Sequence, residues 1–324
     1  MKLNHPFLYL PSKKENNESI IESFGDKKQF VQKVQKALGR KERYIVSSDS
    51  EETTFSMGIE AAKGALRENN IDISEIDIII FASCTPEYVM PSNALKIHSE
   101  LGGKFSTVCY DLNSNSIGGF VALDQIAKYL SGSKYSKKGL VICADKFSNI
   151  SGSVNPIISF CFSDSALAFI IEKDESSSGL IDVQYYCDSQ HHDKNVYPPK
   201  GYSNYKNTDI IQWDSTFDGL SSVKFAKENL EEFLEKNNTK LNDIDLFLFS
   251  QFSLKNIELI INHFNLPTDK VPFYSHELGY TSASSPFVAL EQYEKNVKKI
   301  KKGEKILLWT LGTGILAGLM LWEY

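Results

Sequence analysis

Apolar and polar positions alternate in blocks along the chain, and these blocks predict alternating strands and helices. Short continuous apolar runs bounded by turn residues predict buried strands at 76–84, 104–112, 139–147 and 165–173. Apolar residues three and four positions apart predict amphipathic helices at 56–69, 93–103 and 119–132. Continuous strands that alternate with helices are typical of a sheet covered on both faces, so we expect a layered α/β fold.

The same order of elements returns in the second half of the chain. The pattern there predicts strands at 180–189, 244–252 and 270–274, helices at 221–237, 254–264 and 284–300, and a final strand pair within 304–322. Two segments match clearly, NNIDISEIDIIIFASCTPEY at 69–88 and NNTKLNDIDLFLFSQFSLKN at 237–256. The repetition predicts a duplicated α/β unit with halves at 1–173 and 174–324. Two unrelated α/β segments are the alternative.

Composition and charge exclude several classes of protein. With 324 residues, 42% of them hydrophobic, the chain can bury a sizeable core. A formal net charge of -6 argues against a nucleic-acid partner. No run reaches the ~18 to 20 apolar residues that a membrane span needs, and the N-terminus lacks the features of a secretory signal. We therefore expect a cytoplasmic protein that makes no contact with membranes.

The cysteines give no sign of a disulfide framework or a metal site. There are five of them, at 84, 109, 143, 161 and 187, an odd number with wide spacing and no Cys-x-x-Cys pair. We interpret them as buried, reduced thiols. The sequence suggests neither a metal nor a cofactor.

A collinear set of motifs carries a family resemblance. In chain order the motifs are GRKERY (39–44), YDLNSNSIGGF (110–120), CADKFS (143–148), GYTSASSPF (279–287) and GTGILAG (312–318). The set resembles β-ketoacyl-acyl-carrier-protein synthase III and its ketosynthase-like relatives. This resemblance implies a thiolase-like αβαβα layered sandwich of two pseudo-repeated halves, assembled as a dimer. It also implies acyl transfer in fatty-acid-like or secondary-metabolite biosynthesis, with an acyl carrier protein or acyl-CoA as donor.

The residues that match the family's reactive positions differ from the family pattern. Where typical members carry a nucleophilic cysteine, a histidine and an asparagine, this chain carries Ser116, Ser250 and Tyr280. A serine and a tyrosine can each donate a hydrogen bond, but neither is cationic, so decarboxylative condensation is disfavoured relative to simple acyl transfer. Transfer needs a nucleophile, a base and an oxyanion hole. The resemblance assigns that hole to the amide of Ser116 and the loop of Gly312, Thr313 and Gly314.

Ser116 needs a partner base, because a hydroxyl is far less acidic than a thiol. The chain has six histidines. His276 precedes the GYTS segment by a few residues, and His191 and His192 lie in an insertion that borders the acyl pocket in relatives. These are the candidate bases, and a loop histidine without such a role is the alternative for each.

Two further positions match family functions. Met90 matches a residue that relatives send into the partner's pocket, and Lys255 matches a basic position that meets the carrier protein. A core methionine and a solvated lysine are the respective alternatives.

Three interpretations of the whole protein remain open. The first is an acyltransferase that uses Ser116, and the second is a catalytically silent subunit in a heterodimer with an active ketosynthase. The third is an engineered form in which serine replaces cysteine.

Overall fold

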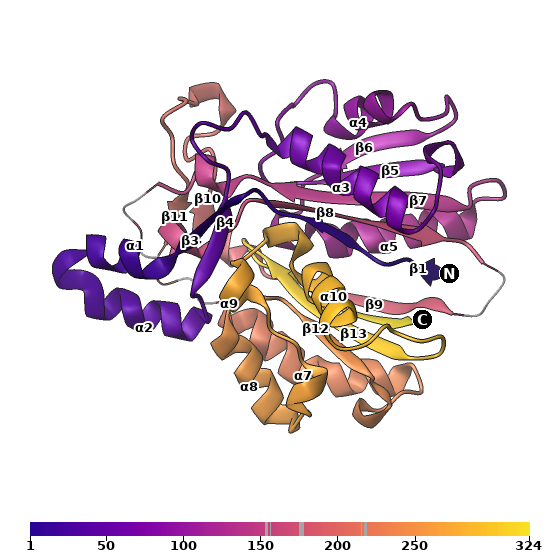
Figure 1. Ribbon diagram of the computed structural model, residues 1–324. Helices are drawn as coiled ribbons and strands as arrows, with labels where there is room; N and C mark the ends of the chain where they lie inside the picture. Colours follow the sequence, from indigo (N-terminus) through magenta and orange to yellow (C-terminus); the bar gives the residue numbers. More distant parts are fainter. Residues whose placement is uncertain (153–154, 156, 175–177, 215, 217–218) are drawn as a thin grey trace.

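A computed structural model describes residues 1–152, 155, 157–174, 178–214, 216 and 219–324. Two main β-sheets lie one above the other and are covered by helices (Figure 1). In the first sheet the order is β1-β8-β7-β5-β6, with β2 also paired to β8. Its strands are β1 (Lys2–Leu3), β2 (Phe7–Tyr9), β5 (Ile78–Ala82), β6 (Val108–Leu112), β7 (Lys138–Asp145) and β8 (Ser165–Glu172).

The second sheet has the order β12-β13-β14-β9. Its strands are β9 (Gly179–Cys187), β12 (Leu246–Phe249), β13 (Lys305–Gly312) and β14 (Leu316–Glu323). The main helices are α3 (Thr54–Glu68), α4 (Asn93–Leu101), α5 (Gly118–Gly132), α7 (Leu220–Lys236), α8 (Leu254–Phe264) and α10 (Ser285–Asn296). Smaller elements are α1 (Asn17–Ser23), α2 (Lys28–Leu38), α6 (Ile158–Cys161), α9 (Ser275–Leu278), β3 (Lys13–Asn16), β4 (Glu42–Ile45), β10 (Asn195–Val196) and β11 (Gln212–Trp213).

The central strands are continuous apolar runs in the sequence because both of their faces are buried. Successive side chains of a strand point to opposite faces. On β5, Ile78 and Ile80 pack with α5 and α10 in the central layer, whereas Ile79 and Phe81 pack with α3 and α4 in the outer layer. The second sheet is covered in the same way by α5 and α10 on one face and by α7 and α8 on the other. Figure 1 shows the resulting five layers, which are the expected αβαβα sandwich.

The duplication extends to backbone detail. Asn70 and Asn238 occupy matching positions, and both take a left-handed φ, 53° and 51° respectively. A short 3₁₀ turn follows each of them, Ile73–Glu75 in the first half and Leu241–Asp243 in the second. Then β5 and β12 begin. The two segments that match in sequence therefore fold alike.

The structure differs most from the expected elements at three places. Residues 104–107 form a turn, in which the Thr107 amide donates to the Lys104 carbonyl, so β6 begins only at Val108. The segment 270–274 is not a strand, and the helix expected over 284–300 ends at Asn296. The proposed division at 173–174 falls between β8 and β9 and stays a prediction. In the described part of the chain, no helix is both long and apolar enough to cross a membrane.

Candidate active site

Ser116 lies in the short turn that joins β6 to α5. This turn, η3 (Asn115–Ile117), begins with a left-handed Asn115 at φ 52°, a conformation that asparagine tolerates better than most residues. The helix α5 starts at Gly118 and has no side-chain hydrogen bond at its N-cap. The Ser116 hydroxyl is therefore not a helix cap. Its oxygen lies 3.2 Å from the Ser282 hydroxyl oxygen.

Gly119 allows α5 to approach the loop that carries Ser282. A Cβ added at Gly119 would lie 2.4 Å from the Ala283 carbonyl oxygen and 2.9 Å from the Cys143 sulphur. A larger residue would push the helix away from this loop. The close packing keeps Ser116 at the N-terminus of α5, where the helix dipole concentrates partial positive charge.

The Tyr280 hydroxyl lies close to both Ser116 and Ser250, so the structure brings together the three positions that the resemblance singled out. Both side chains are buried, each with 2% of its surface exposed. Burial raises the pKa of Tyr280 to about 12, and the neighbouring hydroxyls of Ser116 and Ser250 oppose this rise. The Ser250 Oγ forms no hydrogen bond of standard geometry with any described residue. At neutral pH these three positions therefore present uncharged hydroxyl groups.

Arg40, from the GRKERY motif, holds the segments that carry Ser250 and Tyr280. Its guanidinium donates hydrogen bonds to the carbonyl oxygens of Cys161, Gln251 and Phe252, at 3.3, 2.8 and 2.7 Å respectively. It also lies 5.8 Å from the centroid of the Tyr280 ring, in the range of a cation–π contact. The motif alone did not reveal this role, because every carbonyl partner outside its own segment lies more than 100 residues away in sequence.

Three residues that the sequence did not single out complete the surroundings of Ser116. Ser282 is fully buried and contacts both the Ser116 hydroxyl and, at 3.5 Å, the Cys84 sulphur. Burial raises the pKa of Cys84 well above its usual range, and the negative charge of Asp145 adds to the rise. Asp145 ends strand β7 and is 1% exposed. Asp145 and Ser282 lie inside the motifs CADKFS and GYTSASSPF, but neither motif indicated that these side chains surround Ser116. Cys84 was marked only as one of five cysteines.

The three histidines proposed as bases make their contacts with other groups than Ser116. The His276 ring stacks on Phe273, and its Nε2 lies 3.4 Å from the Glu277 carboxylate. The His191 Nε2 lies 3.6 Å from the Asp188 carboxylate, and the His192 Nδ1 lies 3.0 Å from the Ser189 carbonyl oxygen. A base role for any of the three stays a prediction, without support from these contacts.

The loop of Gly312, Thr313 and Gly314 lies against the turn of Ser116, as the resemblance implied. The Asn115 side-chain amide donates to the Thr313 carbonyl at 3.1 Å. A Cβ added at Gly312 would lie 3.0 Å from the Ser114 carbonyl oxygen. An oxyanion-binding role for this loop remains a prediction.

Met90 and Lys255 both lie on the surface. Met90 is 87% exposed, which excludes the alternative of a core methionine within this chain. Lys255 is exposed on the first turn of α8. Neither side chain contributes to the walls of the cavities around Ser116. Their roles toward a partner chain or a carrier protein stay predictions.

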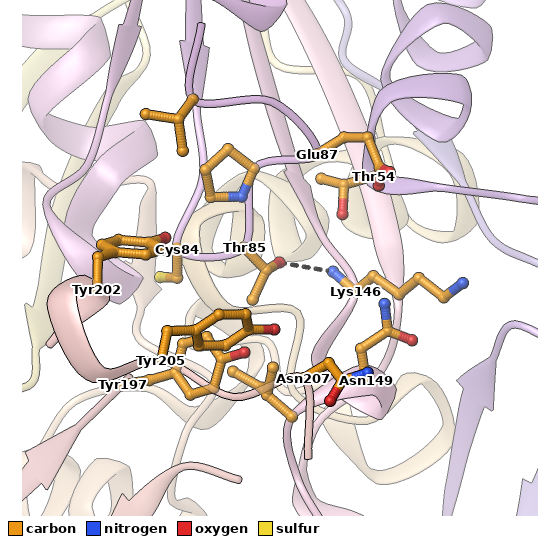
Figure 2. A pocket seen from close by; sticks show the side chains of 13 residues that line it. Thr54, Cys84, Thr85, Glu87, Lys146, Asn149, Tyr197, Tyr202, Tyr205 and Asn207 are labelled. Atoms are coloured by element: carbon orange, nitrogen blue, oxygen red, sulfur yellow. Dashed lines mark hydrogen bonds between the residues drawn. The ribbon is translucent and has the colours of Figure 1, made fainter. Parts of the chain in front are cut away.

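Ser116 opens onto little free volume. A space of about 10 Å³ separates it from the rings of Tyr280 and Trp213, and a space of about 70 Å³ lies on the side of Cys84 and Tyr197. A much larger cavity of about 470 Å³ begins beyond Cys84. Figure 2 shows Cys84 on its wall together with three tyrosines. A volume near 70 Å³ holds only a few water-sized groups, so this conformation leaves room for a short acyl group beside Ser116.

The cysteines are free thiols, but they are not all buried. Cys143 and Cys161 are buried, Cys84 and Cys109 are partly exposed, and Cys187 is exposed. The expectation of five buried thiols is therefore wrong for Cys187, because its strand β9 lies at the edge of the second sheet. The described residues contain no group of three or more histidine, cysteine or acidic side chains that could hold a metal ion.

The fold and the placement of Ser116 define a protein of the thiolase-like, ketosynthase class. Residues 110–189 match the family described as 3-oxoacyl-[acyl-carrier-protein] synthase III, and residues 234–324 match its C-terminal part. The β-ketoacyl-[acyl-carrier-protein] synthase III of Sulfurovum sp. is 30% identical over 317 residues, which cover 95% of this chain and 91% of the relative. The chain belongs to the 3-oxoacyl-[acyl-carrier-protein] synthase III family.

Two further comparisons agree with this membership. The synthase III of Clostridium novyi is 29% identical over 327 residues, which cover 98% of this chain and 97% of the relative. The crystal structure of 3-oxoacyl-[acyl-carrier-protein] synthase III from Aquifex aeolicus superposes with a TM-score of 0.85 at 27% identity, covering 100% of this chain and 99% of the other. The likeness therefore spans both halves of the fold.

Proposed function

We propose that this protein moves an acyl group from an acyl-carrier-protein or acyl-CoA thioester to an acceptor, with Ser116 as the attachment point. The observation that carries the proposal is the Ser116 hydroxyl. It lies at the N-terminus of a buried helix, is not used as a cap, and borders a cavity. Partial positive charge at such a helix start stabilises the oxyanion that forms when a thioester is attacked. Family membership supports acyl transfer as the class of reaction.

The surroundings of Ser116 favour transfer over decarboxylative condensation. Condensation needs donors that stabilise an enolate, and a cationic imidazole is the stronger donor. Tyr280, with its pKa raised to about 12, is a neutral donor at physiological pH. Ser250 is neutral as well. We therefore expect acyl loading to occur without decarboxylation of a malonyl thioester.

A catalytically silent partner subunit is the second candidate. The specific observation in its favour is the small free volume around Ser116, about 10 Å³ on one side and about 70 Å³ on the other. A subunit that only shapes an active partner needs no substrate cavity of its own. The dimeric state, homomeric or heteromeric, and the cytoplasmic location stay predictions.

Intact-mass measurement separates the two candidates. The protein is incubated with acetyl-CoA, hexanoyl-CoA and the corresponding acyl carrier proteins, and its mass is followed with time. The enzyme gains one acyl group per chain, and Ser116→Ala does not. No adduct with any donor, together with co-purification of a cysteine-bearing homologue from the source cells, would favour the silent subunit.

A further inference from the structure

Asp145 is a buried acid with one oxygen fully engaged and one oxygen unpaired. Its Oδ1 accepts hydrogen bonds from the Ser83 hydroxyl, the Cys84 amide, and both the amide and the hydroxyl of Thr85, at 2.7–3.1 Å. Its Oδ2 is buried and forms no hydrogen bond of standard geometry with any described residue. The Ser282 hydroxyl faces this carboxyl group closely enough to lower its pKa. An unpaired carboxylate oxygen inside a protein is unfavourable, so its retention calls for an explanation.

Ser282 stands between Asp145 and Ser116 in an unfavourable backbone conformation. Its φ is 53°, in the left-handed region that suits glycine. A glycine at this position would avoid the strain but would lack the hydroxyl. That hydroxyl contacts Ser116 at 3.2 Å and Cys84 at 3.5 Å. Strained residues of this kind cluster at functional sites, where the surrounding structure holds them in place.

We infer that Asp145 receives the proton of Ser116 through the Ser282 hydroxyl, so that the two residues together replace the missing histidine base. The inference rests on the proposed function, because it concerns the loading of Ser116. Ser282 touches the nucleophile, and Asp145 acts through it. The Ser116 and Ser282 hydroxyl oxygens lie 3.2 Å apart, and Ser282 lies close enough to the Asp145 carboxyl group to lower its pKa.

Loading begins with attack of the Ser116 oxygen on the thioester. The Ser116 O–H bond breaks as its oxygen bonds to the thioester carbonyl carbon. The Ser116 proton passes to the Ser282 oxygen, while the proton of Ser282 passes to the Asp145 carboxylate. When the tetrahedral intermediate collapses, its C–S bond breaks and the leaving thiolate takes up one proton, which returns from Asp145 through Ser282. Asp145 and Ser282 end in their starting states.

The groups around Asp145 allow it to act in the physiological pH range. Burial raises the pKa of Asp145 to about 6, despite the opposing hydrogen bonds from Cys84, Thr85, Ser282 and Ser83. The titratable groups that face it are the thiols of Cys84, from the loop after β5, and Cys143, from β7. The pKa of each thiol is raised by burial first and by Asp145 second, so both stay neutral. The ammonium group of Lys146, the next residue, donates a hydrogen bond to the Glu52 carbonyl oxygen and not to Asp145.

The test is the rate at which acetyl-CoA acylates Ser116, measured by intact mass between pH 5 and pH 9. In the unmodified protein the rate is expected to rise up to about pH 6 and then to level off. Asp145→Asn and Ser282→Gly are expected to be roughly 100-fold slower, in the range of general-base catalysis, and to lack this rise. Ser284→Ala is the matched control, because the Ser284 hydroxyl lies on the same turn but bonds to the Thr281 carbonyl.

Ser282→Gly separates a chemical role from a structural one. Because glycine relieves the strain at φ 53°, the thermal unfolding midpoint of this variant should equal or exceed that of the unmodified protein, even though loading is slower. Loading of Ser116 at an unchanged rate in both variants would overturn the relay and leave the proposed function standing. An adduct on Cys84, recognised by its release with neutral hydroxylamine, would also overturn it. Absence of any adduct in the unmodified protein would remove the proposed function and the relay together.

Discussion

Replacing Asp145 with asparagine removes a buried charge while keeping its hydrogen bonds. The amide oxygen can accept the bonds that Oδ1 now accepts from Ser83, Cys84 and Thr85. Burial raises the pKa of Asp145 from 3.8 to about 6, so the folded state binds this proton more tightly than an unfolded chain does. The contribution of this group to stability is therefore full below pH 3.8 and is lost as the pH rises through 6.

The size of the effect follows from the two pKa values. One pKa unit corresponds to about 1.36 kcal/mol, so the whole difference is about 3 kcal/mol. About half of it, roughly 1.4 kcal/mol, develops between pH 5 and pH 8. Asparagine is neutral at every pH. The free energy of unfolding of Asp145→Asn should therefore gain about 1.4 kcal/mol on that of the unmodified protein over this interval.

Urea unfolding followed by tryptophan fluorescence at pH 5, 6, 7 and 8 measures this difference. The comparison between pH values matters more than the absolute values, because it cancels the change of shape and hydrogen bonding between the two side chains. Ser284→Ala is the control, since it changes no titratable group. If the difference between Asp145→Asn and the unmodified protein stayed constant across this range, Asp145 would titrate near its ordinary pKa and the reasoning would be refuted.

Three further outcomes are expected. Gly119→Ala should lower the free energy of unfolding by about 2 kcal/mol or more, because the added Cβ would lie 2.4 Å from a backbone oxygen. Gly132→Ala is the control in the same helix and should change the free energy of unfolding little, because nothing lies within 4 Å of its Cβ. Urea unfolding measures both variants. Iodoacetamide should label the exposed Cys187 first and the buried Cys143 only on unfolding, by peptide mass mapping; equal labelling rates would contradict the described exposure. The triple variant Ser116→Cys, Ser250→His, Tyr280→Asn carries the residues that the resemblance implies at these positions. It should release CO₂ from a malonyl thioester at a rate at least 10-fold above that of the unmodified protein, on the order of a single acid–base or oxyanion group. No gain in rate would contradict the match of these three positions to the reactive residues of the family.

The sequence predicted the layered fold because the information for it is local. Strands buried on both faces must be apolar throughout, so β5, β7 and β8 were visible as continuous runs. The repeat was visible because 69–88 and 237–256 kept the same turn and strand residues. The errors arose where tertiary packing, and not the local apolar pattern, decided the backbone conformation. At 270–274 the apolar residues Val271 and Phe273 pack in the core of the second half, but the segment pairs with no strand.

The reactive positions were only partly predictable. Motif order marked Ser116, Ser250 and Tyr280, and the fold does gather them. The same reasoning pointed to histidines as the base, because a histidine is the usual proton acceptor and three of them, His191, His192 and His276, lie near the relevant loops in sequence. It passed over Asp145 and Ser282, although both lie inside motifs that had already been recognised.

By itself, then, the sequence determined the alternation of strands and helices and their duplication, and it predicted Ser116, Ser250 and Tyr280 as the matches to the family's reactive positions. The tertiary structure decided which side chains surround Ser116. Ser282 lies 166 residues from Ser116 along the chain and 198 from Cys84, yet its hydroxyl contacts both. Contacts over such separations depend on how close α5 can pack against the 281–284 loop, and this depends on the missing side chain of Gly119. No local pattern of residues encodes that distance.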